Sequence, residues 1–460
     1  MSMVRHRRTR RAREGERGMT LILVAIAMVS MLAMVALAID VITLYSARSE
    51  AQSAADAAAL AAAKMLVAAG VTADPQQISD PSLQATAQTL ATKVAQDVAG
   101  KAAIAGRAIL PADVSVAFPN SATPTFGINP TVSVTVQNTN LPTFFSRIWS
   151  RSPLTVRVSA KAEAFNPSNS SSVGTGAPTV ARCVKPFLLP NCDPVNPNNP
   201  GSNCGGGIAR FFNPATGAIV NPGQYPTGVI GETFNMVSNC GPGPVCVLGP
   251  PTATPAPPSP VLMYYPAPLP TPLAGSSCPS CTAGASDYQS DIECCNPTPL
   301  SCGTSSNTVT ADASVYPEGG TLPARDGIEC LIHQNGGNGQ DILNDSVLPG
   351  PLTYPLQIQP GSRHPLSASF AANEAVTTSD SLITVPVYEP VPGPPPTSGT
   401  PVPVIGFLQL FVVQVFPGGG GPKAGEIEVT VVNVSGCGSS ATGTPVYGAG
   451  VSAVPVRLIQ

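Results

Sequence analysis

The chain has 460 residues, a formal net charge of −3 and only 11% charged residues, whereas charged residues make up about a quarter of an ordinary soluble domain. Glycine and proline are abundant, with 43 and 52 residues. This composition argues against a helical bundle and favours loop-rich β structure joined by extended connectors. The length is typical of roughly two to four folded units.

Positive charge is concentrated at the N-terminus. Residues 1–18 contain two glutamates and seven arginines, namely Arg5, Arg7, Arg8, Arg10, Arg11, Arg13 and Arg17. A basic terminus can bind nucleic acid, but an apolar segment follows at once, and basic residues beside a membrane span mark its cytoplasmic side. We therefore expect the arginines to orient a membrane protein, and we expect no nucleic-acid partner.

Residues 19–39 form an uncharged apolar segment in which only Thr20 and Ser30 are polar. As a helix this segment is about 31 Å long, which matches the hydrocarbon core of a bilayer. The sequence therefore predicts a single transmembrane helix with a cytoplasmic N-terminus. Everything after Asp40 is then exported.

A cleaved leader is the main alternative to this anchor. A small-residue site ends at Ala38, and cleavage there would make Ile39 the first residue of the mature chain. The segment is longer than the apolar core of an ordinary leader, so an anchor is favoured. A prepilin-type cut after Gly18 is disfavoured, because the fifth position after it is Leu23 where prepilins have glutamate.

Residues 40–69 are rich in alanine, the best helix former, and no glycine or proline interrupts the chain between Gly18 and Gly70. A helix can therefore continue out of the membrane. Its apolar seam repeats at alternating spacings of three and four residues and consists of Leu44, Ala47, Ala51, Ala54, Ala58, Ala61 and Met65. This seam could pack on the protein's own exported region or on a partner helix.

The N-terminal pattern is similar to that of a known family. It consists of Arg17-Gly18, the apolar span, and a signature made of Asp40, Tyr45, Arg48, Gln52 and the block Ala54-Ala55-Asp56-Ala57-Ala58-Ala59-Leu60-Ala61. Over about the first 65 residues the chain resembles the TadG-like proteins of Flp pilus assembly, which begin with a TadE/TadG-like membrane helix. The resemblance implies a bacterial inner-membrane protein with a periplasmic region that works with pilus and secretion machinery. It assigns no role to Asp40 or Asp56.

Many larger members of that family carry a von Willebrand A domain with an Asp-x-Ser-x-Ser metal motif. The nearest match here is Asp312-Ala-Ser314-Val-Tyr316, which lacks the second serine. We therefore expect no such domain in this chain.

The expected fold class is α+β, with a transmembrane helix that continues into a long alanine-rich helix and is followed by disulfide-stabilised, β-rich exported units. A second helix is expected within 78–106, beginning near Asp80-Pro81. Apolar and polar residues then alternate, which predicts strands at 114–118, 132–136 and 154–158. Residues 40–166 would form an α+β module whose likeness to pilin architecture is one of fold only.

Proline-rich stretches divide the remaining chain. The predicted parts are a Cys-rich unit at 167–249, a linker at 250–275, a second Cys-rich unit at 276–388, a linker at 389–403 and a C-terminal β unit at 404–460. Strands are expected at 381–388, 404–415 and 426–434, and an edge strand within 446–458. The strand at 404–415 is apolar enough to be central, and it is too short to cross a membrane as a helix.

All 12 cysteines follow the apolar segment: Cys183, Cys192, Cys204, Cys240, Cys246, Cys278, Cys281, Cys294, Cys295, Cys302, Cys330 and Cys437. An even number in an exported chain predicts up to six disulfides, whose pairing cannot be deduced. The cluster from Cys278 to Cys302 could instead hold zinc. A redox role for Cys278 and Cys281 is disfavoured because no thioredoxin-like βαβ pattern lies nearby.

Other candidate sites are weaker. Residues 336–344 match one calcium-binding nonapeptide, but such repeats share each ion between neighbouring turns, so a glycine and asparagine turn is favoured. His6, His333 and His364 stand apart from one another in the sequence. No hydrolase, phosphate-loop or dinucleotide motif is present in the sequence.

These observations favour a membrane-anchored structural or assembly protein of a Flp-type pilus or its secretion machinery, without enzymatic activity or a cofactor. Its expected partners are pilus-assembly or secretion proteins, or further copies of the chain. A secreted or cell-surface binding protein with a cleaved leader is one alternative. An exported metal-dependent protein that uses residues 278–341 is the other.

Overall fold

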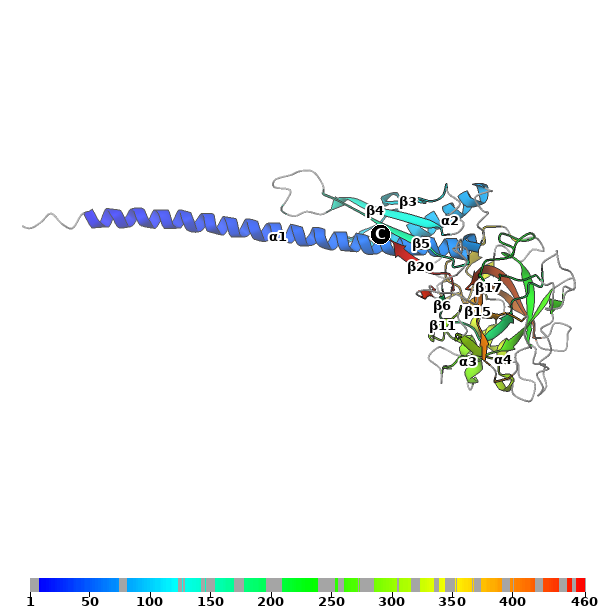
Figure 1. Ribbon diagram of the computed structural model, residues 1–460. Coiled ribbons are helices and arrows are strands. Elements are labelled where there is room, and N and C mark those ends of the chain that lie inside the picture. The colour runs from blue at the N-terminus through cyan, green and yellow to red at the C-terminus, as the bar shows by residue number, and fades with distance from the viewer. Residues whose placement is uncertain are drawn as a thin grey trace, which may run out of the picture. The chain divides into compact units, whose positions relative to one another are not determined.

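The structure is a computed structural model (Figure 1). It describes residues 8–73, 81–122, 126, 129–141, 145, 154–168, 178–195, 209–238, 253–254, 260–271, 273, 285–303, 306–315, 323–334, 339–343, 352, 354–365, 367, 374–390, 398–399, 401–417, 425–437, 445–448 and 452–459. Backbone alone is described at residues 8–18, 81–83, 140, 253–254 and 313. The fold class is α+β, as expected from the sequence.

One long helix begins the described chain. Helix α1 runs without a break over Arg8–Ala68, because alanine and leucine dominate it and no glycine or proline interrupts it after Gly18. It ends where Gly70 donates its N–H to the carbonyl oxygen of Val67 at 3.0 Å. The predicted transmembrane segment and the predicted alanine-rich helix are therefore parts of a single helix.

The chain forms two compact units. The first unit comprises residues 1–57, 96–115 and 134–160, and the second unit comprises residues 58–95, 116–133 and 161–460. The elements up to residue 164 are α1, a 3-10 turn at Val71–Ala73, α2 (Pro81–Gly100), β1 (Ala103–Ile104), β2 (Arg107–Ala108), a 3-10 turn at Pro111–Asp113, β3 (Val114–Ala117), β4 (Thr131–Leu141) and β5 (Leu154–Ala164). The second predicted helix and the three predicted strands of this region are all present.

The remaining elements are short strands and three short helical segments. They are β6 (Thr179–Ala181), β7 (Phe187–Pro190), β8 (Thr233–Ser238), β9 (Ala253–Thr254), β10 (Val261–Pro266), α3 (Asp287–Glu293), β11 (Leu300–Ser301), β12 (Thr308–Thr310), a 3-10 turn at Ala313–Val315, α4 (Pro323–Leu331), β13 (Ile342–Leu343), β14 (Ile358–Gln359), β15 (Leu382–Tyr388), β16 (Pro401–Pro403), β17 (Gly406–Val415), β18 (Ile427–Gly436), β19 (Val446–Tyr447) and β20 (Val456–Ile459).

A seven-stranded sheet forms the centre of the second unit. Its order is β7-β15-β17-β18-β8-β10-β9, and β7 also pairs with β10, so six of the strands form a closed ring. Closure removes the exposed edges that a sheet of this size would otherwise present. The strands come from stretches on both sides of the proline-rich linkers, and β9 and β10 lie within residues 250–275, which were predicted to be a linker. These stretches are therefore interleaved in space. The unit boundaries that the sequence suggests remain predictions.

Both faces of this sheet are buried. Phe187, Leu189, Tyr264 and Leu408 belong to the larger apolar cluster, whereas Leu188, Tyr265, Tyr388 and Phe407 belong to a second cluster. Successive residues of a strand belong to different clusters because their side chains point to opposite faces of the sheet. All residues of β15 are buried, and β17 lies between β15 and β18. The central position predicted for residues 404–415 is confirmed.

Smaller sheets complete the fold. Their orders are β11-β6-β19, β12-β16, β13-β14, β1-β2 and β20-β5-β4-β3. In the last sheet, Val456–Ile459 pairs antiparallel with Lys161–Ala164, so the C-terminal edge strand is confirmed.

Gly70 is required where α1 ends. Its φ is +76°, and a Cβ atom placed there would lie 2.8 Å from Cγ2 of Ile230. We expect Gly70→Ala to lower the free energy of unfolding by about 2–4 kcal/mol, from the left-handed backbone and the added close contact. Denaturant unfolding of the detergent-solubilised full-length protein measures this loss.

Gly106→Ala is the matched control for that substitution. Gly106 has φ +78°, but a Cβ atom there would meet nothing within 4 Å. Gly106→Ala should lower the free energy of unfolding by only about 1–2 kcal/mol, which is the contribution of the left-handed backbone alone. Equal losses for the two variants would mean that Ile230 moves aside and that space at Gly70 is not limiting.

Candidate functional site

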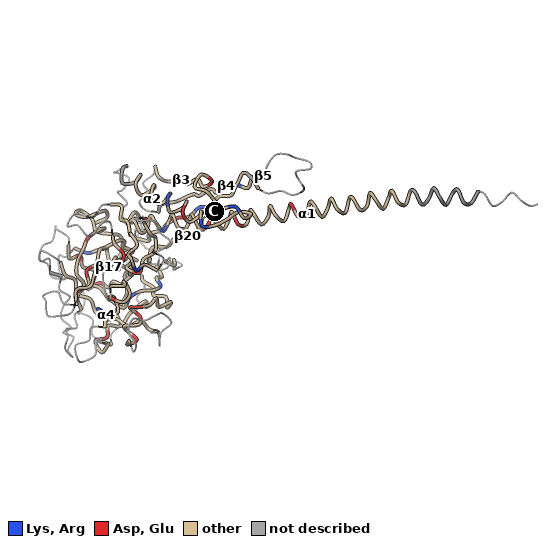
Figure 2. The backbone as a smooth tube through the Cα atoms, turned by 180° about the vertical axis from the view of Figure 1, so that it is seen from behind, with Lys and Arg blue, Asp and Glu red and all other residues tan. Residues whose placement is uncertain are grey.

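The first part of α1 has an exposed apolar surface. Leu21 and Met34 are each 72% exposed, and most other large side chains between Met19 and Ile42 are more than half exposed. An 18-residue window of this helix has a mean hydropathy of 2.9 with only 6% of it buried. Figure 2 shows that the coloured part of α1 begins with a long uncharged stretch. Within the described chain, α1 is the one helix long and apolar enough to cross a membrane.

Asp40 marks the end of this apolar segment and is buried, with 4% of its surface exposed. The N–H of Phe145 donates to both carboxylate oxygens of Asp40, at 3.1 and 3.4 Å. Phe145 belongs to the connection between β4 and β5, in the same unit. Asp40 therefore ties this connection to the helix at the point where the apolar segment ends. No role for Asp40 could be predicted from the sequence, because its partner lies 105 residues away.

The remaining signature residues divide into two groups. Gln52 donates through Nε2 to Oδ1 of Asp56 at 2.8 Å and to the carbonyl oxygen of Ser159 on β5 at 3.4 Å. In Figure 1, α1 runs beside β5. Tyr45, by contrast, is 78% exposed, and Arg48 is also exposed. Gln52 and Asp56 thus support the fold of the first unit, whereas Tyr45 and Arg48 remain on its surface.

The alanine seam is covered by the chain itself. Five of its members are buried, with at most 4% exposed, namely Ala47, Ala51, Ala54, Ala58 and Met65, while Leu44 and Ala61 are half-buried. The first of the two uses left open by the sequence, packing on other parts of the same chain, accounts for these five residues. A partner helix would have to use another face of α1.

The N-terminal arginines fall at the limit of the described chain. Arg8, Arg10, Arg11, Arg13 and Arg17 lie in α1 with only their backbone described, and Arg5 and Arg7 lie outside the described residues. Their role in membrane orientation remains a prediction.

The described cysteines form disulfides. Cys183 pairs with Cys295 and Cys302 pairs with Cys437, and Cys192, Cys294 and Cys330 are also disulfide-bonded. Cys204, Cys240, Cys246, Cys278 and Cys281 lie outside the described residues. Because Cys294, Cys295 and Cys302 are oxidised, they cannot be the thiolate ligands of the alternative zinc cluster.

Residues of the calcium-type nonapeptide also have protein partners. Asp341 is buried, and its carboxylate accepts from the N–H of Gly361 at 2.7 Å and from Oγ of Ser379. Residues 336–338 and 344 are outside the described chain. Among the described residues, no group of three or more His, Cys, Asp or Glu side chains could share a metal ion.

The histidines are likewise engaged. Nε2 of His333 lies 3.0 Å from Oδ2 of Asp380, and Nε2 of His364 lies 3.2 Å from the carbonyl oxygen of Thr378. His6 is outside the described residues. Ser314 N–H donates to Asp312 at 2.9 Å, which gives the Asp312 motif a local turn contact.

Comparison with known proteins identifies the N-terminal part of the chain. Residues 18–70 match the family model of TadE/G-like Flp pilus-assembly proteins. Neither the curated proteins nor the solved structures that were searched gave a match. The resemblance drawn from the sequence is confirmed over these residues, which include the apolar segment, the signature and the end of α1.

Proposed function

Starting from the TadE/G-like segment at residues 18–70, we propose that the protein is a membrane-anchored structural or assembly component of a Flp-type pilus or its secretion machinery. It acts without catalysing a reaction. The anchor lies in a bacterial inner membrane, with the N-terminus in the cytoplasm and the region after Asp40 in the periplasm.

The continuity of α1 is the observation that carries the anchor. The same helix has an exposed apolar surface at Leu21 and a buried surface at Met65, which is 0% exposed. A leader peptide would be removed by cutting this helix after Ala38. An uncut helix holds the folded units at the membrane surface, as an assembly component requires.

Charge and disulfides support the orientation. Arginines are concentrated before the apolar segment, which favours a cytoplasmic N-terminus. The seven described cysteines all follow the segment and are all oxidised. Disulfides persist in oxidising compartments such as the periplasm. The arginines before the apolar segment and the disulfides after it therefore favour the same topology, with the N-terminus in the cytoplasm.

The exposed face of α1 beyond the membrane is the expected partner surface. Tyr45 and Arg48 lie on it, a few residues after the apolar segment. Tyrosine and arginine contribute strongly to protein interfaces, and their place in the family signature supports contact with another pilus or secretion protein or with a second copy.

The test is deletion of the gene in its own strain and complementation with the full-length chain. We expect the deletion to abolish or strongly reduce pili in electron micrographs, and Arg48→Glu to restore them much less well than wild type. Lys93→Glu, a charge reversal at an exposed position of α2, is the matched control and should restore them fully. Unchanged piliation in the deletion strain would overturn the proposed role.

Mass spectrometry of the N-terminus tests the anchor separately. A chain that begins near Met1 and is found only in membranes agrees with the proposal. A start at Ile39 in the soluble fraction would replace the anchor with a cleaved leader, and a start at Met19 would indicate prepilin-type processing.

A further inference from the structure

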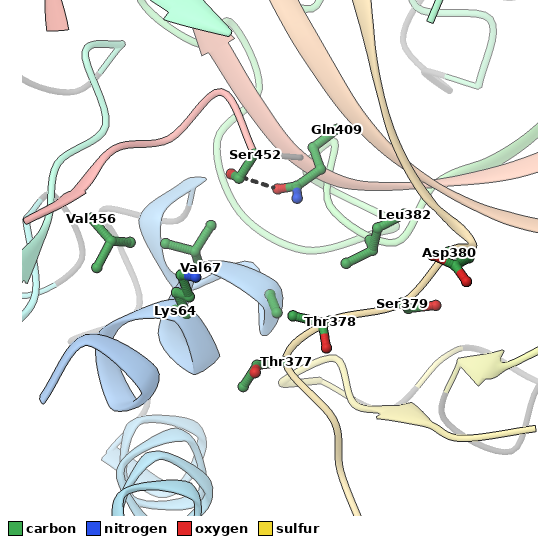
Figure 3. A pocket seen from close by; sticks show the side chains of 11 residues that line it. Lys64, Val67, Thr377, Thr378, Ser379, Asp380, Leu382, Gln409, Ser452 and Val456 are labelled. Carbon is green, nitrogen blue, oxygen red and sulfur yellow. Dashed lines mark hydrogen bonds between the residues drawn. The ribbon is translucent and has the colours of Figure 1, made fainter. Parts of the chain in front are cut away.

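A cavity of about 220 Å³ lies in the second unit, beside the last turn of α1. Figure 3 shows Lys64 and Val67 of α1 on one side of it and Gln409 and Leu382 on the other, with Thr377 and Thr378 along a third side. Val67, Leu382 and Gln409 are each 3% exposed, so the inner wall is buried. The exposed Thr378 places the mouth at this third side.

Gln409 supplies a buried donor that faces the cavity. Oε1 of Gln409 accepts from Oγ of Ser452 at 3.2 Å, and Ser452 is itself 8% exposed. This contact leaves Nε2 of Gln409 without a protein acceptor among the described residues, and Figure 3 shows it directed into the cavity. This amide group can therefore donate to a ligand or a water molecule in the cavity.

Lys64 gives the cavity its charge. The other charged lining residue, Asp380, points away from the cavity in Figure 3 and pairs with Nε2 of His333 at 3.0 Å. Lys64 makes no ion pair within the part of the chain that the structure describes. Lys64 therefore brings a positive charge to the side of the cavity that lies across from Gln409.

The rest of the lining is apolar or hydroxylated. Val67, Ala68, Leu382 and Val456 supply aliphatic surface, and Thr377 and Thr378 supply hydroxyl groups. An anion that fits must therefore combine strong acceptor oxygens with a short aliphatic part. A phosphate or sulfate ion has the acceptors but nothing to bury against Val67 and Leu382.

We propose that this cavity binds a carboxylate that carries a short aliphatic group, with the carboxylate on Lys64 and Gln409 and the aliphatic group against Val67 and Leu382. Such a group occurs on a free short-chain acid and at the C-terminus of a polypeptide that ends in valine or leucine. The proposal is independent of the pilus role, because it rests on the second unit alone.

Isothermal titration calorimetry on the full-length protein in detergent tests the proposal with three probes. They are 3-methylbutanoate, the tripeptide Gly-Gly-Val with a free C-terminus, and the same tripeptide as its C-terminal amide. We expect at least one free acid to bind and the amide not to bind. Binding of 3-methylbutanoate alone identifies a free acid as ligand, and binding of the free tripeptide identifies a chain end.

Two variants and a control make the test specific. Lys64→Met keeps the aliphatic stem and should weaken binding at least tenfold, Gln409→Leu should weaken it severalfold, and Lys93→Met should leave it unchanged. Lys64→Gln replaces the first variant if that protein unfolds. Lack of binding by both free acids at 10 mM, or equal affinity in the Lys64 variant and wild type, would overturn the proposal.

Discussion

Replacing both Cys302 and Cys437 with alanine is expected to lower the free energy of unfolding of the second unit by about 4–5 kcal/mol. The bond joins residues 135 apart in the sequence, and a cross-link that closes a long loop removes much of the conformational freedom of the unfolded chain. Cys302 follows β11 and Cys437 follows β18, so the bond fastens a small sheet to the closed ring. Both cysteines are fully buried.

The measurement is guanidinium unfolding of the detergent-solubilised protein under non-reducing conditions, followed by tyrosine fluorescence. The matched pair Cys183 and Cys295 closes a loop of similar length, with a separation of 112 residues, and its double alanine variant should show a comparable loss. Both variants should retain β structure at low denaturant, because the apolar clusters remain.

Val309→Ala separates the cross-link from packing. Val309 is 2% exposed and lies in the same apolar cluster as Cys302 and Cys437, so its truncation removes buried surface without opening a loop. It should cost about 1–3 kcal/mol. If the double cysteine variant loses no more free energy of unfolding than Val309→Ala does, the disulfide stabilises the protein only through the packing of its sulfur atoms. Loop closure would then contribute nothing.

Local patterns were sufficient to predict the two long helices and the strands β15, β17 and β18 of the ring, but the short helices α3 and α4 and the strands β8 and β10 were not predicted. The uninterrupted alanine-rich run from Asp40 specified the second half of α1, which ends at Ala68. The largely apolar run after Val404 specified β17 as a central strand, since a strand buried on both faces needs apolar residues at nearly every position. The membrane segment and the family signature were likewise local, and the family match covers the same residues.

Long-range pairing could not be predicted in the same way. Closure of the ring depends on β7, a strand of four residues that contacts both β15 and β10. Nothing within Phe187–Pro190 specifies those partners. The Asp40 contact with Phe145 and the disulfide pairs have the same character, because each joins segments that lie more than a hundred residues apart.

Two buried ionisable groups in the second unit were also without a local signal. Glu232 directly precedes β8 and is 2% exposed; burial, together with the nearby carboxylate of Asp193, raises its pKa to about 10. Lys185 is 3% exposed and donates through Nζ to the carbonyl oxygen of Cys294 at 2.6 Å. Burial lowers the pKa of Lys185 to about 7, and the attraction of Asp291 only partly offsets this.

Glu232 and Lys185 are expected to change the free energy of unfolding in opposite directions as the pH rises. Glu232 keeps its proton in the folded state but loses it above pH 4.5 in the unfolded state, so its contribution falls by about 1.4 kcal/mol per pH unit between about pH 5 and 9. Lys185 loses its proton above pH 7 in the folded state but keeps it to about pH 10 when unfolded. Its contribution therefore rises by a similar amount per unit above pH 7.

Glu232→Gln and Lys185→Met isolate the two contributions. We expect the free energy of unfolding of Glu232→Gln minus that of wild type to rise by about 1.4 kcal/mol per pH unit from pH 5 to 9. For Lys185→Met the same difference should be constant from pH 5 to 6.5 and should fall between pH 7.5 and 9. Subtracting wild type removes the contributions of all other titrating groups that the two proteins share.

Guanidinium unfolding in buffers at half-unit pH intervals provides these differences. Lys93→Met, which replaces an exposed lysine of α2, is the control for the removal of a lysine side chain. A constant difference for Glu232→Gln would show that Glu232 is ionised in the folded protein at neutral pH. Its charge would then have to be compensated inside the second unit, and the unpartnered Oε2 of its carboxylate would be the atom at which to look for that compensation.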